Sequence, residues 1–382
     1  MCNKQEIRAS RVFLFMLYSA HIIFLGLSIG RSVSAQATNE KVTFFPSFTQ
    51  PAIHNLVIAG PTDTAIFSQL ITRFQQFHPT VSVQYHDIGT LELYDRIINQ
   101  DINDVDLVIS SATHLQLKLV NDGHALTYSS PLTEDLPDWA QWRNKLFGFT
   151  LEPITFVYNK DLPPEYKPRT RSAFLQAIEK DPIFWRSKTS TYDIAKSGLG
   201  YLLAVYDERT SSNFWGMANA LGHTATQLYA TTGEILDEIT KGNVLVGYNV
   251  LGSYALARQA QGDPIEVIIP EDYVIIFSRT AFISKHSTHP ELAGKFIDFL
   301  LSDEGQKLID ERLQLGALIK DTSHQWPTES LHEIFVAPIQ PITIGPGLLA
   351  SLDETRKQRF IKNWNRLITD TPDLATPSKK HK

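Results

Sequence analysis

The chain has 382 residues, a formal net charge of −6 and a single cysteine, Cys2. This length is sufficient for two domains with large hydrophobic cores. The acidic balance argues against nucleic acid as a partner, and one cysteine excludes a disulfide within the chain.

The first 35 residues have the pattern of a cleavable signal peptide. A basic start with Lys4, Arg8 and Arg11 precedes an almost continuously apolar run over 12–29, and small residues then lead to Ala35. A membrane-anchor helix is the alternative, because about 18 apolar residues nearly span a bilayer. The small residues after the run favour cleavage. We therefore predict an exported, periplasmic protein whose mature chain lacks cysteine.

Strand and helix patterns alternate regularly in the next segment. The predicted strands are 55–60, 81–88 and 106–110, and the predicted helices are 65–77, 91–99 and 113–120. This order is typical of an α/β fold with a mostly parallel sheet that helices cover on both faces. We assign residues 36–150 to the first part of one lobe.

A long, apolar, β-rich stretch over 147–158 indicates the first crossing into a second lobe, which we assign to residues 151–270. The sequence predicts helices at 171–185, after 197–200, at 214–221, from 231 to 241 and at 253–259, with a strand at 244–250. Two further strands, at 264–270 and 273–284, are expected to return the chain toward the first lobe.

The remaining chain is mainly helical. A strongly periodic stretch over 289–313 is broken near Ser302, and a last helix is expected at 348–368. We assign 271–370 to the return into the first lobe and the C-terminal helices. Residues 371–382 are rich in Pro, Thr and Lys and are predicted to be a disordered tail.

Four short runs rich in hydroxyl residues or glycine lie just before predicted helices. Helix N-termini present unpaired N–H groups and the positive end of the dipole, so several of them around one cleft favour an anion. Each run alone is more typical of an ordinary helix cap, but open α/β sheets bind ligands beyond the carboxyl ends of their strands. Asp63 has two open roles, as a cap or as an acceptor for a ligand hydroxyl. The predicted ligand contacts are Thr62, Asp63, Ser110 and Ser111 in one lobe and Ser197, Gly198, Thr232 and Gly233 in the other.

Arg279 lies inside an otherwise apolar stretch. A buried arginine requires an acidic partner or a ligand anion, and its planar fork suits phosphate or carboxylate. The alternative to ligand binding is a salt bridge to Asp272 or to another structural acid.

The turn that follows the predicted strand at 244–250 is also polar. Its side chains can bond a polyhydroxylated ligand, or they can pack and cap the turn. We predict ligand binding because the turn is expected to face the same cleft. The residues concerned are Tyr248, Asn249, Ser253 and Tyr254.

Signals for an enzyme or a metal site are poor. The sequence has no HExxH, P-loop or GxSxG motif. His286 and His289 are close together, but Pro290 places them in a loop before a helix, where capping is the expected role. We predict no catalytic residue, no cofactor and no resident metal.

Three segments together resemble the extracellular solute-binding proteins of ABC transporters. Residues 290–306 (PELAGKFIDFLLSDEGQ) resemble the late helical signature of that family, and residues 158–161 (YNKD) resemble its crossing segment. Residues 242–254 (GNVLVGYNVLGSY) resemble the strand and turn of its second domain. The resemblance covers residues 53–320. It implies a two-lobed type 2 periplasmic binding fold that closes on its ligand and docks on a permease.

Within that family the chain is similar to the ferric-ion-binding group and to its relatives for phosphorylated organic ligands. Ferric binders use adjacent tyrosines where this chain has Ser253 and Tyr254, so a phosphate ester is favoured over iron. The resemblance implies a monomeric binding protein for a phosphoglycerate or sugar phosphate, with Arg279 pairing the anionic group. Closure is expected around hinges near 150–156 and 268–280. The alternatives are a ferric-binding protein and a periplasmic sensor that partners a histidine kinase.

Overall fold

The computed structural model describes residues 41–311, 316, 318 and 337–369. The chain divides into residues 1–39 and residues 40–382, and all elements below belong to the second unit. The predicted signal peptide and the predicted tail lie outside the described residues. Within the described part of the chain, no helix is long and apolar enough to cross a bilayer.

The first sheet has a parallel centre and antiparallel margins. Its strand order is β1-β3-β2-β4-β13-β6-β5, in which β3, β2 and β4 run parallel. The prediction of a mostly parallel sheet is wrong here, because β13 and the β5–β6 hairpin extend the sheet antiparallel to β4 and to each other. The strands are β1 (Lys41–Phe45), β2 (His54–Gly60), β3 (Val81–Asp87), β4 (Leu107–Ser110), β5 (Gln141–Trp142), β6 (Leu146–Gly148) and β13 (Thr280–Ile283).

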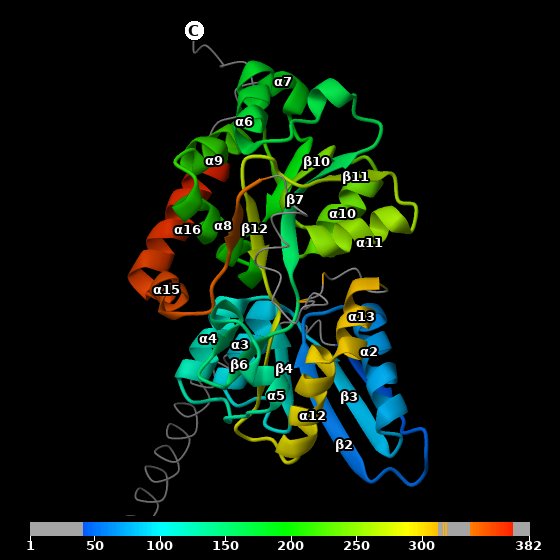
Figure 1. Cartoon of the computed structure of the whole chain (residues 1–382). Coiled ribbons are helices and arrows are strands. Elements are labelled where there is room, and N and C mark those ends of the chain that lie inside the picture. Colours follow the sequence, from blue (N-terminus) through cyan, green and yellow to red (C-terminus); the bar gives the residue numbers. More distant parts are fainter. Residues whose placement is uncertain (1–40, 312–315, 317, 319–336, 370–382) are drawn as a thin grey trace, which may run out of the picture. The chain divides into compact units, whose positions relative to one another are not determined.

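Helices cover both faces of this sheet, as the sequence predicted (Figure 1). Alternate residues of β2 point to opposite faces: Ile58 joins the core cluster of Phe67 and Phe296, whereas Val57 joins that of Leu117. The helices are α2 (Thr64–Phe77), α3 (Thr90–Ile98), α4 (Thr113–Asn121), α5 (Pro131–Glu134), η1 (Asp138–Ala140), α12 (Pro290–Leu301) and α13 (Asp303–Glu311).

The second sheet is also mixed. Its order is β14-β12-β7-β10-β8-β9, with β11 pairing β7. Strands β10, β8 and β9 run parallel, and β7 is antiparallel to its neighbours. The strands are β7 (Glu152–Asn159), β8 (Thr189–Tyr192), β9 (Gln227–Tyr229), β10 (Val246–Leu251), β11 (Ile265–Ile268), β12 (Val274–Phe277) and β14 (Ile339–Pro341).

The helices around the second sheet begin close to their predicted positions. Pro182 divides the expected 171–185 helix into α6 and α7, because proline lacks the N–H that would continue it. The helices of this half are η2 (Pro164–Tyr166), α6 (Arg171–Lys180), α7 (Pro182–Trp185), α8 (Gly198–Thr210), α9 (Phe214–His223), α10 (Thr232–Thr240) and α11 (Gly252–Ala260).

Two long predicted strands are each broken where the chain passes between the sheets. The stretch 147–158 forms β6 and β7, and the stretch 273–284 forms β12 and β13. In each pair one strand belongs to the first sheet and the other to the second. The breaks lie at residues 149–151 and 278–279. They overlap the segments near 150–156 and 268–280 in which the sequence places the hinges.

The C-terminal segment contacts both halves. After β14, the N–H of Ile344 donates to the carbonyl of Trp139 (2.8 Å), and the Tyr201 hydroxyl on α8 donates to the carbonyl of Ser351 (2.6 Å). The expected helix 348–368 is interrupted, because Asp353 leaves the helical conformation and caps a new helix. The segment consists of α15 (Pro346–Leu349), η3 (Ala350–Leu352) and α16 (Glu354–Ile368).

Candidate functional site

The strand ends of the two sheets border one polar cluster. In the first sheet, β4 ends at Ser110, which lies opposite Thr280 at the start of β13. In the second sheet, β10 ends at Leu251, which lies opposite Ile154 near the start of β7. Arg279, which directly precedes β13, and Glu152, the first residue of β7, contact each other through their side chains. Loops that follow strands of both sheets therefore converge here.

Arg279 and Glu152 form a buried ion pair at this junction. Nε of Arg279 donates to Oε1 of Glu152 at 2.8 Å and Nη2 donates to Oε2 at 3.2 Å, and the two side chains are 2% and 0% exposed. Burial lowers the pKa of Arg279, but the Glu152 carboxylate, together with Tyr254 and Tyr85, raises that pKa overall. The acid beside Arg279 is thus Glu152 and not Asp272, which pairs with Arg171 at 3.0 Å.

The guanidinium keeps some hydrogen-bonding capacity. Nη1 donates to Oγ1 of Thr62 at 2.9 Å, and the backbone N–H of Arg279 donates to Oγ1 of Thr150 at 2.8 Å. A guanidinium carries five N–H groups. Among the described residues, one N–H of Nη1 and one of Nη2 have no acceptor.

Two residues from the start of α11 complete the cluster. The Ser253 hydroxyl donates to Oε2 of Glu152. The Tyr254 hydroxyl accepts a bond from the N–H of Asp63 (3.4 Å), and its ring centroid lies 5.4 Å from Cζ of Arg279. Burial raises the pKa of Tyr254, so its hydroxyl stays protonated at neutral pH. The structure therefore brings together five of the predicted site residues: Thr62, Asp63, Ser253, Tyr254 and Arg279.

A second group of predicted residues meets where α3, α4 and α8 begin. The N–H of Gly198 donates to Oγ1 of Thr90 at 3.1 Å. A Cβ added to Gly198 would lie 3.1 Å from Cβ of Ala112. The buried Ser111 and Ser110 directly precede Ala112, and Oγ of Ser110 accepts the N–H of Ala112 at 3.0 Å. Three helix starts from the two sheets are therefore in contact.

Several of these helix starts have no capping side chain. The N-cap residues of α3, α4 and α11 are Gly89, Ala112 and Leu251, and none of them makes a side-chain cap hydrogen bond. The Asp63 carboxylate makes no cap bond to α2, but Oδ2 of Asp87 accepts the N–H and the hydroxyl of Thr64 at that helix start, both at 3.0 Å. By contrast, Oγ of Ser197 accepts the N–H of Gly200 and caps α8. The uncapped starts leave backbone N–H groups for another acceptor.

The Thr231-Thr232-Gly233 run is mainly a helix start. Thr231 and Glu234 form a reciprocal capping box at the start of α10. Thr232 is buried, and its hydroxyl lies 2.7 Å from that of Tyr192, which also accepts the N–H of Leu251. Burial raises the pKa of Tyr192 to about 12. Thr232 thus reaches the end of β10 through Tyr192, whereas no hydrogen bond among the described residues connects Gly233 to the cluster.

Tyr248 and Asn249 belong to a different buried network. The Tyr248 hydroxyl donates to Asp207 at 2.5 Å, and the Asn249 side-chain amide donates to the same carboxylate at 2.7 Å. Nε of Arg171 lies 3.4 Å from Asp207, and the Tyr273 hydroxyl also donates to it. These contacts engage the Tyr248 hydroxyl and the Asn249 amide in holding α8 against the second sheet.

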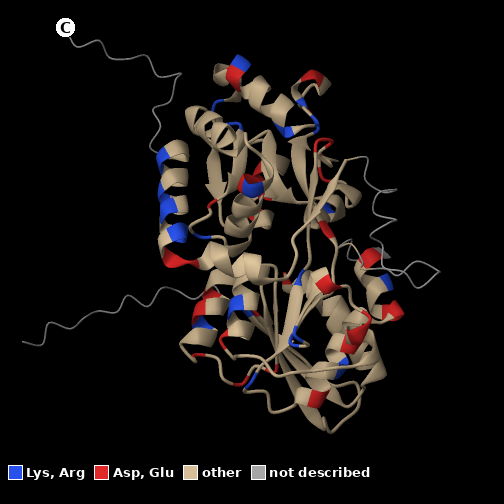
Figure 2. Cartoon of the chain, turned by 60° about the vertical axis from the view of Figure 1, so that its left-hand side comes forward, with Lys and Arg blue, Asp and Glu red and all other residues tan. Residues whose placement is uncertain are grey.

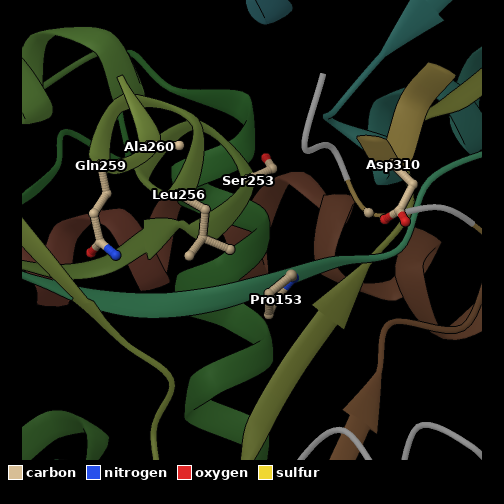
Figure 3. A pocket seen from close by; sticks show the side chains of 7 residues that line it. Pro153, Ser253, Leu256, Gln259, Ala260 and Asp310 are labelled. Atoms are coloured by element: carbon tan, nitrogen blue, oxygen red, sulfur yellow. The ribbon is translucent and has the colours of Figure 1, made fainter. Parts of the chain in front are cut away.

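An open pocket of about 440 Å³ lies between α11 and the end of α13 (Figure 3). Of the predicted site residues, only Ser253 lines it. Because Ser253 also bonds Glu152, the pocket adjoins the Arg279 cluster. The lining residues are Pro153, Ser253, Leu256, Gln259, Ala260, Asp310 and Gly316.

Sequence reasoning missed Glu152, Thr90 and His114. Glu152 lies inside an apolar strand pattern, so its isolated charge was the available signal. His114, in the first turn of α4, has its ring 5.7 Å from that of Tyr201 on α8. Burial, with a smaller contribution from Lys357, lowers the pKa of His114 to about 3. Its Nδ1 has no hydrogen-bond partner among the described residues.

The described residues contain no group of three or more His, Cys, Asp or Glu side chains that could hold a metal ion. As predicted, the loop with His289 leads into a helix, and His289 is the N-cap residue of α12, but its side chain makes no cap hydrogen bond. Its N–H and that of Thr288 donate to Oδ1 of Asp106, at 3.1 and 3.0 Å.

A family model for bacterial extracellular solute-binding proteins matches residues 59–307. The chain belongs to this family. The family binds substrates and does not catalyse reactions, and it implies export, a small ligand and a membrane ABC permease as partner. No curated protein sequence matches the chain.

Solved structures support the same assignment. A substrate-binding protein of an ABC transporter from Agrobacterium tumefaciens is 30% identical, with a TM-score of 0.80 over 87% of this chain and 99% of that one. AfuA from Actinobacillus pleuropneumoniae, with exogenous fructose-6-phosphate bound, is 16% identical, with a TM-score of 0.64 over 83% and 99%. Iron-bound HitA from Pseudomonas aeruginosa is 18% identical, with a TM-score of 0.56 over 68% and 84%. The two-lobed periplasmic binding fold predicted from the sequence is confirmed.

Proposed function

We propose that this solute-binding protein captures a small phosphorylated organic anion, such as a sugar phosphate or phosphoglycerate, for uptake by an ABC permease. The observation that carries the proposal is the set of uncapped helix starts: those of α3 and α4 meet at Gly198, and that of α11 lies beside the Arg279 cluster. Helix N-termini favour phosphate through free N–H groups and the helix dipole. No catalytic group is required, because closure of the two lobes retains the ligand.

The Arg279 cluster supports the same proposal and indicates which residues would contact the phosphate and which the rest of the ligand. Glu152 neutralises Arg279, so the pair attracts an anion less than a free arginine would. The two remaining guanidinium donors still recognise phosphate oxygens in a fork. The hydroxyls of Thr62 and Tyr254 suit the sugar or glycerate part of the ligand.

The pocket beside Ser253 has a volume in the range of small-molecule sites. AfuA, which shares the fold, was solved with fructose-6-phosphate. We infer that the present chain holds a ligand of the same chemical class between its lobes, after export through the cleavable leader.

A thermal-shift panel tests this function. Phosphoglycerates, sugar phosphates, phosphonates, inorganic phosphate and ferric citrate are each added to the purified protein. A phosphorylated organic compound is expected to raise Tm, because binding to the native state alone stabilises it. A shift with iron alone would contradict the proposal and favour the ferric-binding alternative.

A further inference from the structure

The last helix, α16, is amphipathic, and its apolar side is already covered. The ring of Trp364 lies 5.8 Å from that of Phe214 on α9, and the ring of Phe360 lies 5.0 Å from that of Trp215. Trp364 and Ile368 are buried. These contacts fix which face of α16 points outward.

The outward face carries a row of cations, visible in blue along this helix in Figure 2. Arg356, Arg359 and Lys362 are exposed and lie three residues apart, and Arg366 follows four residues later. At about 100° per residue these four side chains occupy a stripe about 120° wide and about 15 Å long. We call Arg356, Arg359, Lys362 and Arg366 the basic stripe.

The stripe is unusual in an acidic chain. Residues 355–368 contain five Lys or Arg and no Asp or Glu, although the whole protein has a net charge of −6. On α4, by contrast, Lys118 pairs with Asp122, the C-cap residue of the same helix, at 2.6 Å. Within the described residues, Arg356, Arg359 and Lys362 have no ion pair. Their charges are therefore not neutralised by the helix that carries them.

We propose that the basic stripe binds the anionic headgroups of a membrane surface. No stripe residue lines any of four cavities that the described residues form around α11, α2, Tyr192 and Arg171. The basic stripe is a row of exposed cations on a helix surface. Such a row matches an extended anionic surface better than it matches a small anion or a shaped protein epitope. Basic residues near an anionic leaflet each add attraction, and this attraction weakens with salt. Such binding would hold the protein beside the membrane in which its permease resides.

Vesicle sedimentation tests the proposal with the full-length protein. The vesicles are phosphatidylcholine alone or phosphatidylcholine with phosphatidylglycerol, at low and at raised salt. The triple variant R356Q/R359Q/K362Q removes most of the stripe. The matched control K160Q/K180Q/K295Q removes the same charge from exposed residues on three other segments. All proteins keep the same N-terminal segment, so any contribution from its apolar run is common to them.

The expected result is binding to the anionic vesicles at low salt, weakened about tenfold or more in the stripe variant and retained in the control. Equal losses in the two triple variants would overturn the proposal, because net charge alone would explain them. Absence of wild-type binding to the anionic vesicles would also overturn it. So would binding only to membranes that contain the permease, since that result assigns the stripe to a protein partner. Equal Tm values of the variants establish that the stripe variant is folded.

Discussion

Nε of Arg279 lies 2.8 Å from Oε1 of Glu152, and this buried pair joins the two sheets of the protein. Glu152 begins β7 of the second sheet, whereas Arg279 directly precedes β13 of the first. Glu152 directly follows the break between β6 and β7, and Arg279 lies within the break between β12 and β13. The pair is thus a structural element of the crossing as well as a candidate ligand contact.

Removing Glu152 is expected to destabilise the protein strongly. Glu152→Ala leaves Arg279 charged and buried without a partner, and loss of one member of a buried pair costs about 3–5 kcal/mol. Denaturant unfolding measures the change. Glu179→Ala, at an exposed position on α6, is the control and should change stability by less than about 0.5 kcal/mol. Equal stabilities of the two variants would show that the pair is not formed in solution.

A methyl group at Gly198 is expected to weaken ligand binding. Its Cβ would lie 2.9 Å from Oγ1 of Thr90 and 3.1 Å from Cβ of Ala112, so the starts of α3, α4 and α8 would be forced apart. We expect Gly198→Ala to lower the affinity for the phosphorylated ligand at least about tenfold, roughly 1.4 kcal/mol. Gly233→Ala is the matched control, because the nearest atom to its added Cβ is 3.9 Å away. Calorimetric titration compares the two, and unchanged affinity in Gly198→Ala would reject the junction as part of the site.

His114 is expected to make stability depend on pH. Its pKa is about 3 in the folded protein against a usual value of 6.5, so the unfolded chain binds one more proton between these values. Stability must therefore fall as the pH drops below about 6.5, by up to about 1.4 kcal/mol per pH unit from this group. His114→Leu should remove this component, seen as a shallower loss of stability between pH 6.5 and 4. Parallel pH profiles for wild type and variant would contradict the account.

Tyr248 is expected to matter for stability and not for ligand affinity. Its hydroxyl donates to the buried Asp207 carboxylate, and a hydrogen bond to a charged group contributes about 1.5–3 kcal/mol. Tyr248→Phe should lose about that much in chemical unfolding while its dissociation constant for the ligand stays unchanged. A large loss of affinity without loss of stability would restore Tyr248 to the binding site, as the sequence had suggested.

Much of the fold could be predicted from periodicity. The strands and helices from β2 to α4 begin and end within two residues of their predicted positions, because each has a clear apolar pattern. The sequence also predicted that the helical stretch over 289–313 is interrupted near Ser302, where α12 ends. The strands β8 and β9 were missed, since polar TSTY and short QLY carry little hydrophobic signal.

The candidate site was only partly accessible to sequence reasoning. Hydroxyl residues before helices located Thr62, Ser110 and Ser197, but the sequence could not distinguish capped from uncapped starts. The proposed site depends instead on the absence of a capping side chain, as at Gly89 and Ala112, which is seen only in the structure. Long-range partners such as Glu152 for Arg279 depend on how the crossing strands are broken, and local patterns do not contain that information.

The most direct test of the central claim is a calorimetric titration with fructose 6-phosphate or 3-phosphoglycerate, and with fructose or glycerate as their phosphate-free counterparts. The account predicts saturable binding of at least one phosphorylated compound and at least about a hundredfold weaker binding of its counterpart, roughly 2.7 kcal/mol. Equal binding of the two members of each pair, or binding of ferric citrate alone, would contradict it.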